Sequence, residues 1–260
     1  MILERIMQSA SPRLAGKKIR EVRVGLNLLV VDLDDGSLGV TYVLKDDIGH
    51  LCSAVPQAGG LSGKAAGDIA EWAVTGKNVI MVAIGLAVLN SVAAFDNLNQ
   101  ADNTPEADAA FSVAVTPEDT VGVIGHIGPV IAAMTGKAKR VMVFERGQKA
   151  AGDIYPEESQ AELLPQCQVV FVSGTSLING TLETLLPNCT AARDIVLVGS
   201  STPLYPDAFT GSGVTVLAGT KWPQANRDAV LAGISQCAGM QQLIRLGQKI
   251  TVRVPARQAP

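Results

Sequence analysis

Two titratable side chains lie at the ends of runs of apolar residues. His126 follows the apolar run at 120–125, and Glu145 ends the run at 140–145. A neutral imidazole or a carboxylate serves as an acid/base group or as a metal ligand near pH 7. We therefore predict His126 and Glu145 as catalytic or metal-ligating residues. The structural alternatives are a His126 that only caps a loop and a Glu145 that is neutralised by Arg146 beside it.

Glu145 also permits a second interpretation. In dinucleotide-binding folds, an acidic residue at the end of the second strand bonds the hydroxyl groups of a ribose. The glycines of the stretch 122–128 have the spacing GxxGxxG, whereas the dinucleotide fingerprint is GxGxxG. The stretch is therefore weak support for a nucleotide, and a nucleotide- or S-adenosylmethionine-dependent enzyme is kept as an alternative.

Uncharged hydrogen-bonding side chains follow the next apolar runs. The segment 173–181, SGTSLINGT, contains four hydroxyl side chains, one carboxamide and two glycines. Such a loop suits an oxyanion, a carboxylate or a sugar, because glycines expose backbone N–H groups. Residues 199–203, GSSTP, and 219–222, GTKW, repeat this pattern after the two following runs. The structural alternative is that Asn179 or Thr181 only caps a helix.

Buried strands separated by helices must hold these residues. Six apolar runs follow residue 119, with helical spacers between them: TVGVIG (120–125), RVMVFE (140–145), VVFVSG (169–174), DIVLVG (194–199), VTVLAG (214–219) and KITVRV (249–254). Continuous runs of valine and isoleucine are typical of strands that are buried on both faces. The alternation predicts βαβ units and a mostly parallel, Rossmann-like sheet over residues 116–260. Ligands of such sheets bind outside the carboxyl ends of the strands, where the candidate residues above are expected.

Residues 1–115 have a different pattern, which predicts a smaller α+β domain. Its expected elements are a helix over 1–14, hairpin strands over 18–33 and 38–44, a helix over 62–74 with Ser62 as its N-cap, a helix over 78–94 and a last strand over 111–115. Residues 96–110 are polar and acidic, as is typical of a surface linker. Asn90 lies in the apolar helix and either braces the fold or reaches a cleft between the domains. His50 is expected in a loop.

The composition excludes several classes of protein. Hydrophobic residues make up 47% of the 260 residues and the net charge is only −3, so the chain is not intrinsically disordered. A net negative charge argues against a nucleic-acid partner. The uncharged segment 78–95 is at the lower limit of a membrane span, but it contains Gly85, Asn90 and Ser91, which favour a buried helix. The absence of a secretory signal favours a cytoplasmic location.

With these segments in place, the chain resembles a family of bacterial and archaeal proteins of unknown function, which is described as "putative heavy-metal chelation". The matching segments are AIGLAVLNS (83–91), VGVIGHIGP (121–129), VMVFER (141–146), SGTSLINGTLETLL (173–186), GSSTPLYPD (199–207) and VLAGTKW (216–222). The resemblance implies an enolase N-terminal-like domain, a Rossmann-like domain and a site in the cleft between them. Ser200 stands where the family pattern has proline, which weakens the match of that loop.

The resemblance also implies a set of site residues, carried over by position: Asn90, His126, Glu145, Thr175, Asn179, Thr181, Ser201 and Thr202. Gly125, which ends one apolar run, and Thr220, which directly follows another, complete the predicted ligand-binding residues.

The cysteines argue against a heavy-metal cage. Soft metals prefer thiolates, but the cysteines at 52, 167, 189 and 237 are scattered, form no CxxC pair and lie outside the matching segments. Reduced, mostly buried thiols are expected. A divalent metal at His126 and Glu145, or a metal-binding small molecule held by the hydroxyl-rich loops, fits better.

Three functions follow from these residues. We favour a cleft protein that binds or acts on a polar metal-chelating small molecule or a metal ion, without a nucleic-acid or membrane partner. The alternatives are the nucleotide- or S-adenosylmethionine-dependent enzyme and a non-catalytic sensor or binding subunit, which the absence of a recognisable nucleophile motivates. The sequence leaves the substrate, catalysis and the assembly into a homo-oligomer open.

Overall fold

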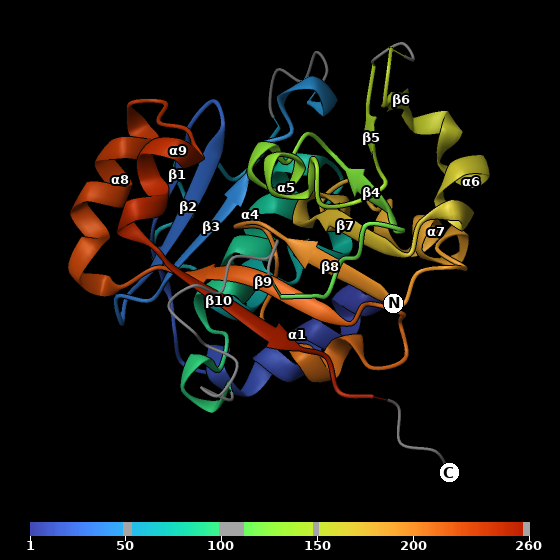
Figure 1. The fold of residues 1–260 in the computed structure, drawn as a ribbon. Coiled ribbons are helices and arrows are strands. Elements are labelled where there is room, and N and C mark those ends of the chain that lie inside the picture. Colours follow the sequence, from blue (N-terminus) through green and yellow to red (C-terminus); the bar gives the residue numbers. More distant parts are fainter. Residues whose placement is uncertain (49–53, 99–111, 148–150, 257–260) are drawn as a thin grey trace.

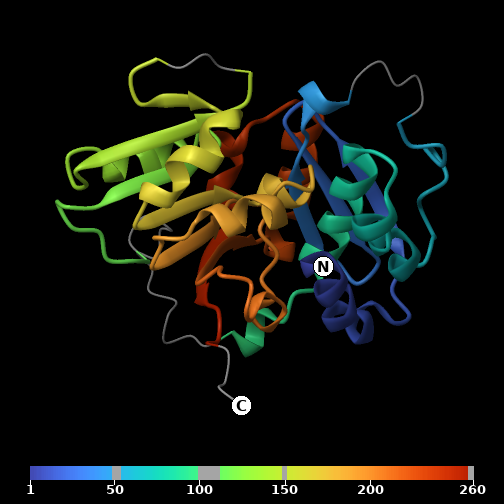
Figure 2. The same ribbon diagram turned by 90° about the vertical axis from the view of Figure 1, so that its right-hand side faces the viewer.

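Two β-sheets lie side by side in the molecule (Figure 1, Figure 2). The computed structural model describes residues 1–48, 54–98, 112–147 and 151–256. The first part of the chain forms a three-stranded sheet with helices, and the second part forms a seven-stranded sheet. The predicted fold class is confirmed, whereas the exact boundary at residue 115 stays a prediction.

The smaller sheet is antiparallel, has the order β1–β2–β3 and packs against helix α4. Its strands are β1 (Ile19–Val24), β2 (Leu28–Leu33) and β3 (Leu38–Tyr42). The helices of this part are α1 (Ile2–Leu14), α2 (Ala66–Ala70), α3 (Trp72–Thr75) and α4 (Val79–Ser91), with the 3-10 turns η1 (Lys45–Asp47) and η2 (Phe95–Asn97). The helix predicted over 1–14 is confirmed as α1.

The strand predicted over 18–33 is two strands, β1 and β2. The chain turns between them, and the Gly25 N–H donates to the Leu28 carbonyl (2.9 Å). The apolar alternation continues through this turn, so the sequence shows no break. The strand predicted over 111–115 is also wrong, because its described residues, 112–115, form no strand. The Ser112 and Ala114 carbonyls accept hydrogen bonds from the side chains of Arg253 and Arg193.

The helix predicted over 62–74 is shorter and interrupted. It begins at Ala66 and is not capped by Ser62, because the residues just before it run beside β1, where the Lys64 carbonyl accepts from the Ile19 N–H (2.9 Å). A break at Glu71 then separates α2 from α3.

Helix α4 confirms the buried helix predicted over 78–94. The Asn78 side chain caps it by accepting from the N–H groups of Ile80 (3.1 Å) and Met81 (3.0 Å). Eleven of its thirteen residues are buried, because the smaller sheet packs against it on one side and α1, α2 and α3 pack against it on others. No helix of the described residues has the length and apolar character that crossing a membrane requires.

The larger sheet has the order β10–β9–β8–β7–β4–β5–β6. Its strands are β4 (Thr120–Ile124), β5 (Arg140–Glu145), β6 (Ile154–Pro156), β7 (Val169–Ser173), β8 (Asp194–Val198), β9 (Val216–Lys221) and β10 (Gln248–Arg253). All neighbours are parallel except β9 and β10. Each of the six predicted apolar runs overlaps one strand, and the short edge strand β6 is the one that the sequence does not predict.

Short helices connect these strands. They are α5 (Gly128–Met134), η5 (Glu157–Ser159), α6 (Gln160–Leu163), η6 (Leu164–Gln166), η7 (Gly174–Leu177), α7 (Leu182–Leu185), η8 (Leu186–Asn188), η9 (Pro206–Phe209), η10 (Gln224–Asn226), α8 (Arg227–Ser235), α9 (Met240–Leu243) and η11 (Ile244–Leu246). Alternate residues of the strands enter different hydrophobic clusters, so both faces of the sheet are buried. One of these clusters is shared with α1 and α4, which joins the two parts of the molecule.

Helix α8 belongs to the second part of the chain but packs on the smaller sheet (Figure 1). Val230, Leu231 and Ile234 of α8 lie in one buried cluster with Leu28 and Val30 of β2. Every residue of β2 is buried, because α4 and α8 both pack against this strand. The two parts of the chain therefore share a core and are interlocked.

Candidate functional site

The larger sheet reverses its strand order between β4 and β7, and a cavity lies there at the carboxyl ends of the strands. From β4 the chain crosses to β5 on one side and then returns to β7 on the other. The cavity has a volume of about 350 Å³, and its lining includes the ends of β4, β5 and β7 and also Leu44, Asp46 and Asp47, which follow β3. Ligands of open parallel sheets bind at such a point. Both parts of the chain contribute to this cavity.

Gly125 directly follows β4 beside the cavity. Its φ angle of +87° is one that glycine adopts readily and other residues rarely do. Its N–H donates to the Phe144 carbonyl of β5 (2.8 Å), and a Cβ atom here would lie 3.3 Å from the Ser173 Cβ of β7. The glycine therefore lets the three strand ends meet closely.

Two polar side chains of the lining have buried oxygen atoms without a partner. Glu145 ends β5, and its Oε2 atom is buried and accepts no hydrogen bond from any described residue. Ser176 is 4% exposed, and its Oγ atom also lacks a partner among the described residues. Such groups are uncommon in native proteins because burial without a hydrogen bond is costly. Each of them indicates a ligand or an ordered water.

The loop after β7 bonds much of its polar surface to itself. The Ser173 and Thr175 hydroxyls are 2.8 Å apart, and the Asn179 Oδ1 atom accepts from the Thr181 N–H (3.2 Å) and hydroxyl (2.8 Å). A backbone N–H can only donate, so this contact fixes the orientation of the Asn179 amide. Thr181 occupies the N-cap position of α7, but its side chain makes no capping bond to the helix.

Arg146 joins the two parts of the chain beside the cavity. Its Nη1 atom donates to both carboxylate oxygens of Asp47 (2.8 and 2.6 Å), and its Nε atom donates to Glu157 (2.8 Å). In the structure, Arg146 therefore pairs with Asp47 and Glu157 and does not neutralise Glu145. Instead, the guanidinium holds the turn η1 of the first part against the end of β5.

His126 is exposed and is not among the lining residues, although it directly follows Gly125. The backbone makes a tight turn here, in which the Ile127 N–H donates to the Gly125 carbonyl (2.9 Å) and the Gly128 N–H donates to the His126 carbonyl (3.2 Å). These two N–H groups are consequently bonded within their own loop. The role of His126 as an acid/base group or metal ligand stays a prediction.

Asn90 and the loop after β8 lie where the two parts of the chain meet. The Asn90 amide nitrogen donates to the Ser200 carbonyl (3.1 Å), and the Ser201 hydroxyl accepts from the Tyr42 N–H (2.9 Å). Both contacts brace the fold, as does the Tyr205 hydroxyl, which donates to the Leu89 carbonyl (2.7 Å). The oxygen atoms Oδ1 of Asn90 and Oγ1 of Thr202 are buried without a partner among the described residues.

The structure thus gathers part of the predicted site. Five predicted residues line the cavity: Gly125, Glu145, Thr175, Asn179 and Thr181. Three others are buried at the junction, namely Asn90, Ser201 and Thr202, whereas Thr220 lies in β9 opposite Lys249. Their roles in ligand binding stay predictions. His50 and Cys52 lie outside the described residues, as does most of the predicted linker.

Sequence reasoning missed the acidic residues of the cavity. Asp46 and Asp47 come from the turn after β3, in the other sheet, and Glu157 follows the unpredicted strand β6. The only sequence signal for them is the polar segment that directly follows the predicted strand over 38–44. Ser176 lies in the predicted hydroxyl-rich loop, where nothing in the sequence distinguishes it from its neighbours.

The cysteines do not supply a metal site in the described part of the chain. Burial raises the pKa of the Cys167 thiol to about 12 and that of Cys189 to about 11, and the two thiols donate to the Leu163 and Leu185 carbonyls. The thiolate is the form that binds soft metals, so these residues are poor ligands. No group of three or more His, Cys, Asp and Glu side chains in the described residues is arranged to hold a metal ion.

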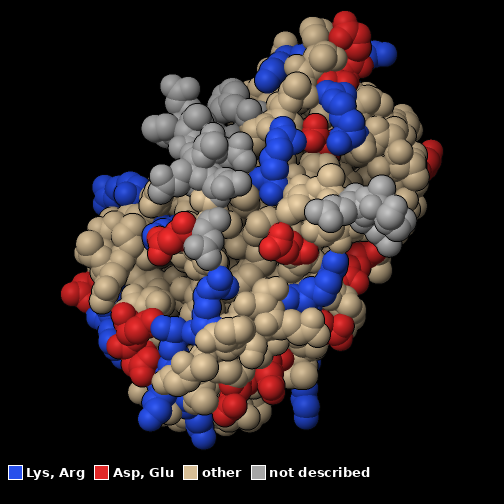
Figure 3. Space-filling view, turned by 90° about the horizontal axis from the view of Figure 1, so that it is seen from below, with Lys and Arg blue, Asp and Glu red and all other residues tan. Residues whose placement is uncertain are grey.

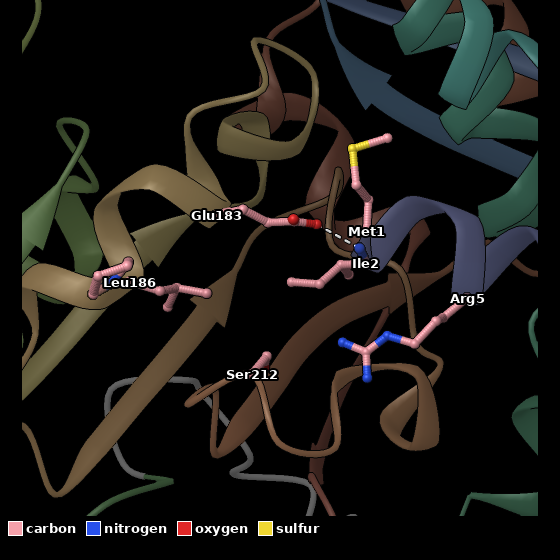
Figure 4. Close-up of a pocket in the computed structure, with 7 residues that line it drawn as sticks. Met1, Ile2, Arg5, Glu183, Leu186 and Ser212 are labelled. Atoms are coloured by element: carbon pink, nitrogen blue, oxygen red, sulfur yellow. Dashed lines mark hydrogen bonds between the residues drawn. The ribbon is translucent and has the colours of Figure 1, made fainter.

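A second hollow, of about 420 Å³, lies where α1 meets α7 (Figure 4). Its main polar groups are bonded across the junction: the Glu183 carboxylate accepts from the Ile2 N–H, and the Arg5 guanidinium donates to the Thr210 carbonyl (2.9 Å). These contacts attach α1 to the second part of the chain. The polar groups of the hollow therefore have a structural role and need no ligand.

Charged side chains of both signs occur together on the face seen from below in Figure 1 (Figure 3). Acidic side chains lie between the basic ones among the residues drawn in colour. A phosphate backbone binds best to a surface on which basic side chains are clustered. The absence of a nucleic-acid partner stays a prediction.

Two family models match the chain, and both carry the description "Putative heavy-metal chelation". One matches residues 108–253 and the other matches residues 7–93. An uncharacterized protein from Methanocaldococcus jannaschii is 28% identical over 149 residues, which is 55% of this chain and 56% of that protein. The match therefore spans little more than half the length of this relative.

Two solved structures have the same fold as this chain. A protein of unknown function from Pyrococcus horikoshii has a TM-score of 0.82 at 23% identity, over 98% of this chain and 100% of that chain. One from Desulfitobacterium hafniense has a TM-score of 0.72 at 21% identity, over 96% and 98%. Both are described as members of the family that matches residues 108–253.

Proposed function

Because this chain belongs to the family described as "Putative heavy-metal chelation", we propose that its cavity at the ends of β4, β5 and β7 binds a polar small molecule that chelates a metal ion. The observation that carries this proposal is the Oε2 atom of Glu145, which is buried beside the cavity without a partner among the described residues. A ligand with a hydrogen-bond donor satisfies this atom. Ser176 Oγ supplies a second such position.

The volume and the lining support a small molecule rather than a bare ion. A cavity of about 350 Å³ is at the lower end of the range for small-molecule sites, which is about 300–1,000 Å³. The Asn179 amide accepts from Thr181 through its oxygen, which leaves its NH2 group to donate to an acceptor on the ligand. Chelating molecules have such acceptor atoms, and the metal is then held by the ligand as well as by Glu145.

The nucleotide alternative has one observation in its favour, since Glu145 ends the strand next to the reversal point, as the ribose-binding acid of a dinucleotide fold does. Against it, the N–H groups of Ile127 and Gly128, which would face a phosphate, bond to their own loop. NAD, FAD and S-adenosylmethionine test this alternative in a thermal-shift panel. A ligand at 100 times its Kd stabilises the protein by about 2.7 kcal/mol. If none of the three compounds raises the melting temperature, the nucleotide alternative is excluded.

Native mass spectrometry of the purified full chain, together with metal analysis of the same sample, tests the proposal. We expect a bound small molecule and a metal ion in equal amounts. The variants Glu145→Gln and Ser176→Ala should each lose most of this adduct, whereas Glu158→Gln, an exposed neighbour outside the lining, should keep it. A wild-type chain without any adduct, which also gains no stability from chelator–metal mixtures, contradicts the proposal.

Two further measurements refine the function. The first compares the metal affinity of the wild type and His126→Ala. Equal affinities exclude His126 as a metal ligand, whereas a lower affinity of the variant supports this predicted role. If a bound ligand is identified and no turnover of it is found, the protein is a sensor or binding subunit, because a catalyst would convert it.

A further inference from the structure

We infer that this cavity selects a compact cation that carries hydrogen-bond donors, such as the metal-loaded form of a chelator with an overall positive charge, over an anionic ligand. The inference rests on the proposed function and adds the charge of the ligand to it. It depends on the charges of the lining, on the contacts of its arginine and on the donors that the loops leave free.

The formal charge of the lining is strongly negative. Asp46, Asp47, Glu145 and Glu157 contribute four carboxylates, and Arg146 is the only basic residue among the described residues of the lining, so the formal charge is −3. Clefts lined by one sign of charge concentrate counter-ions of the other sign. A free chelator with carboxylate or phosphate groups is repelled by this lining.

Arg146 does not offset this repulsion, because its charge is already paired. Its three hydrogen bonds go to Asp47 and Glu157 at 2.6–2.8 Å, and these two carboxylates hold the pKa of its guanidinium above the usual value, with Glu157 as the larger cause. Asp46 and Glu145 are left without any basic partner among the described residues. Asp46 is exposed and solvated, so Glu145, whose Oε2 atom is buried, is the carboxylate that gains most from a cationic ligand.

The backbone turn that follows β4 gives an anion few free donors. The N–H groups of Ile127 and Gly128 bond within their loop, and the next residue, Pro129, has no N–H at all. The hydroxyl groups of Ser173 and Thr175 bond to each other. The Asn179 amide and the Ser176 hydroxyl are the main side-chain donors left for an oxyanion, and the carboxylates of the lining oppose its charge.

The unpartnered atoms point to a ligand with donors. The Oε2 atom of ionised Glu145 can only accept a hydrogen bond, and Ser176, at 4% exposure, has a hydroxyl that accepts as well as donates. Coordinated ammonia, amines or water on a metal ion supply N–H or O–H donors together with positive charge. The acidic lining and the unpartnered Glu145 oxygen thus favour the same kind of ligand, which the Ser176 hydroxyl can also accommodate.

Titration calorimetry with two probes tests the inference. The probes are hexaamminecobalt(III), a compact cation with N–H donors, and citrate, an anionic chelator, each added to the full chain at about 0.15 M salt to screen exposed charges. We expect hexaamminecobalt(III) to bind at one site at least tenfold more tightly than citrate. Glu145→Gln should weaken its binding at least tenfold, and Glu158→Gln should leave it unchanged.

The outcomes separate this inference from the proposed function. Citrate that binds as tightly as hexaamminecobalt(III), with a loss in Glu145→Gln, overturns the charge selection but keeps the cavity as a ligand site. If Glu145→Gln and Glu158→Gln weaken the binding of hexaamminecobalt(III) equally, the probe reports only surface charge. This outcome also overturns the inference. If neither probe binds and native mass spectrometry finds no adduct, both the inference and the proposed function fail.

Discussion

The Arg227 guanidinium of α8 donates two hydrogen bonds to one carboxylate oxygen of Asp32 in β2, from Nη2 (2.6 Å) and from Nε (2.8 Å). The Asp32 side chain is completely buried, and Arg20, the next nearest cation among the described residues, lies 3.7 Å away. Arg227→Ala leaves this carboxylate without its main partner. Because Arg227 is itself 26% exposed, we expect a loss of about 3 kcal/mol in the free energy of unfolding, at the low end for a broken buried pair.

Urea denaturation measures this loss, with Arg253→Ala as the matched control. Arg253 pairs with Asp194 at 3.6 Å but is 58% exposed, so its removal should cost less than about 1 kcal/mol. The double variant Asp32→Leu/Arg227→Met should regain much of the stability, since it removes both buried charges together. Equal stability of Arg227→Ala and the wild type contradicts the importance of the pair.

Asp119 should make the fold sensitive to acid. Arg193, which donates to both oxygens of its carboxylate (2.7 and 2.6 Å), and the Thr116 N–H hold its pKa far below the usual range. A carboxyl group whose pKa is lowered by folding stabilises the protein above its unfolded pKa of about 4, and this contribution is lost as the pH falls toward the folded pKa. Asp119→Asn should therefore be less stable than the wild type at pH 7, with a difference that shrinks between pH 5 and pH 2.5. Urea denaturation at several pH values measures it, and a constant difference argues against this role.

Gly85 should not tolerate a side chain. A Cβ atom at this position of α4 would lie 2.2 Å from the Ala73 nitrogen and 2.7 Å from the Trp72 carbonyl carbon, both of which are backbone atoms of the adjacent helix α3. Gly85→Ala should therefore lower the free energy of unfolding by about 3 kcal/mol, at the upper end for an overpacked core. Gly67→Ala in α2 is the matched control, because no atom lies within 4 Å of its Cβ position. It should raise stability by about 0.5–1 kcal/mol, since alanine favours the helix more than glycine does. Similar thermal melts for the two variants contradict this packing.

The thiols should differ sharply in their reaction with iodoacetamide at pH 8. Cys237 is exposed and should be alkylated in the native protein. Cys167 and Cys189 are buried, and burial raises their pKa values to about 12 and 11, so that little thiolate exists at pH 8. Mass spectrometry of the labelled peptides should find these two alkylated only after urea is added. Labelling of Cys167 at the rate of Cys237 in the native protein contradicts the buried position.

The larger sheet could be predicted from the sequence because its strands are buried on both faces and therefore appear as unbroken apolar runs. The strand β6 escaped prediction, since it is three residues long, lies at the edge of the sheet and contains Pro156. The turn between β1 and β2 was missed for a different reason: Leu26 continues the apolar alternation although it is 64% exposed. Periodicity alone cannot separate an exposed apolar turn residue from a buried strand residue.

The candidate site could be predicted only where it depends on a single sheet. Glu145 ends β5 and Thr175 lies just after β7, and these two strands pair directly with β4, so the position of both residues at strand ends was sufficient. Asp47 enters the cavity from the other sheet and is held there by Arg146. This contact depends on how the two parts of the chain pack, which no local pattern in the sequence encodes. Asn90 shows the converse, since its position in an apolar helix indicated importance but not that it bonds to the Ser200 carbonyl.

The position of α8 limits how the two segments of this chain can be exchanged between relatives. The two family models divide it into segments 7–93 and 108–253, but the second segment carries the helix that packs on Leu28 and Val30 of the first. A gene cut between the two segments yields an N-terminal fragment with an apolar sheet face open to water and prone to aggregation. The halves can therefore be recombined with those of a relative only when the α8 contact surface and the strand beneath it are exchanged together.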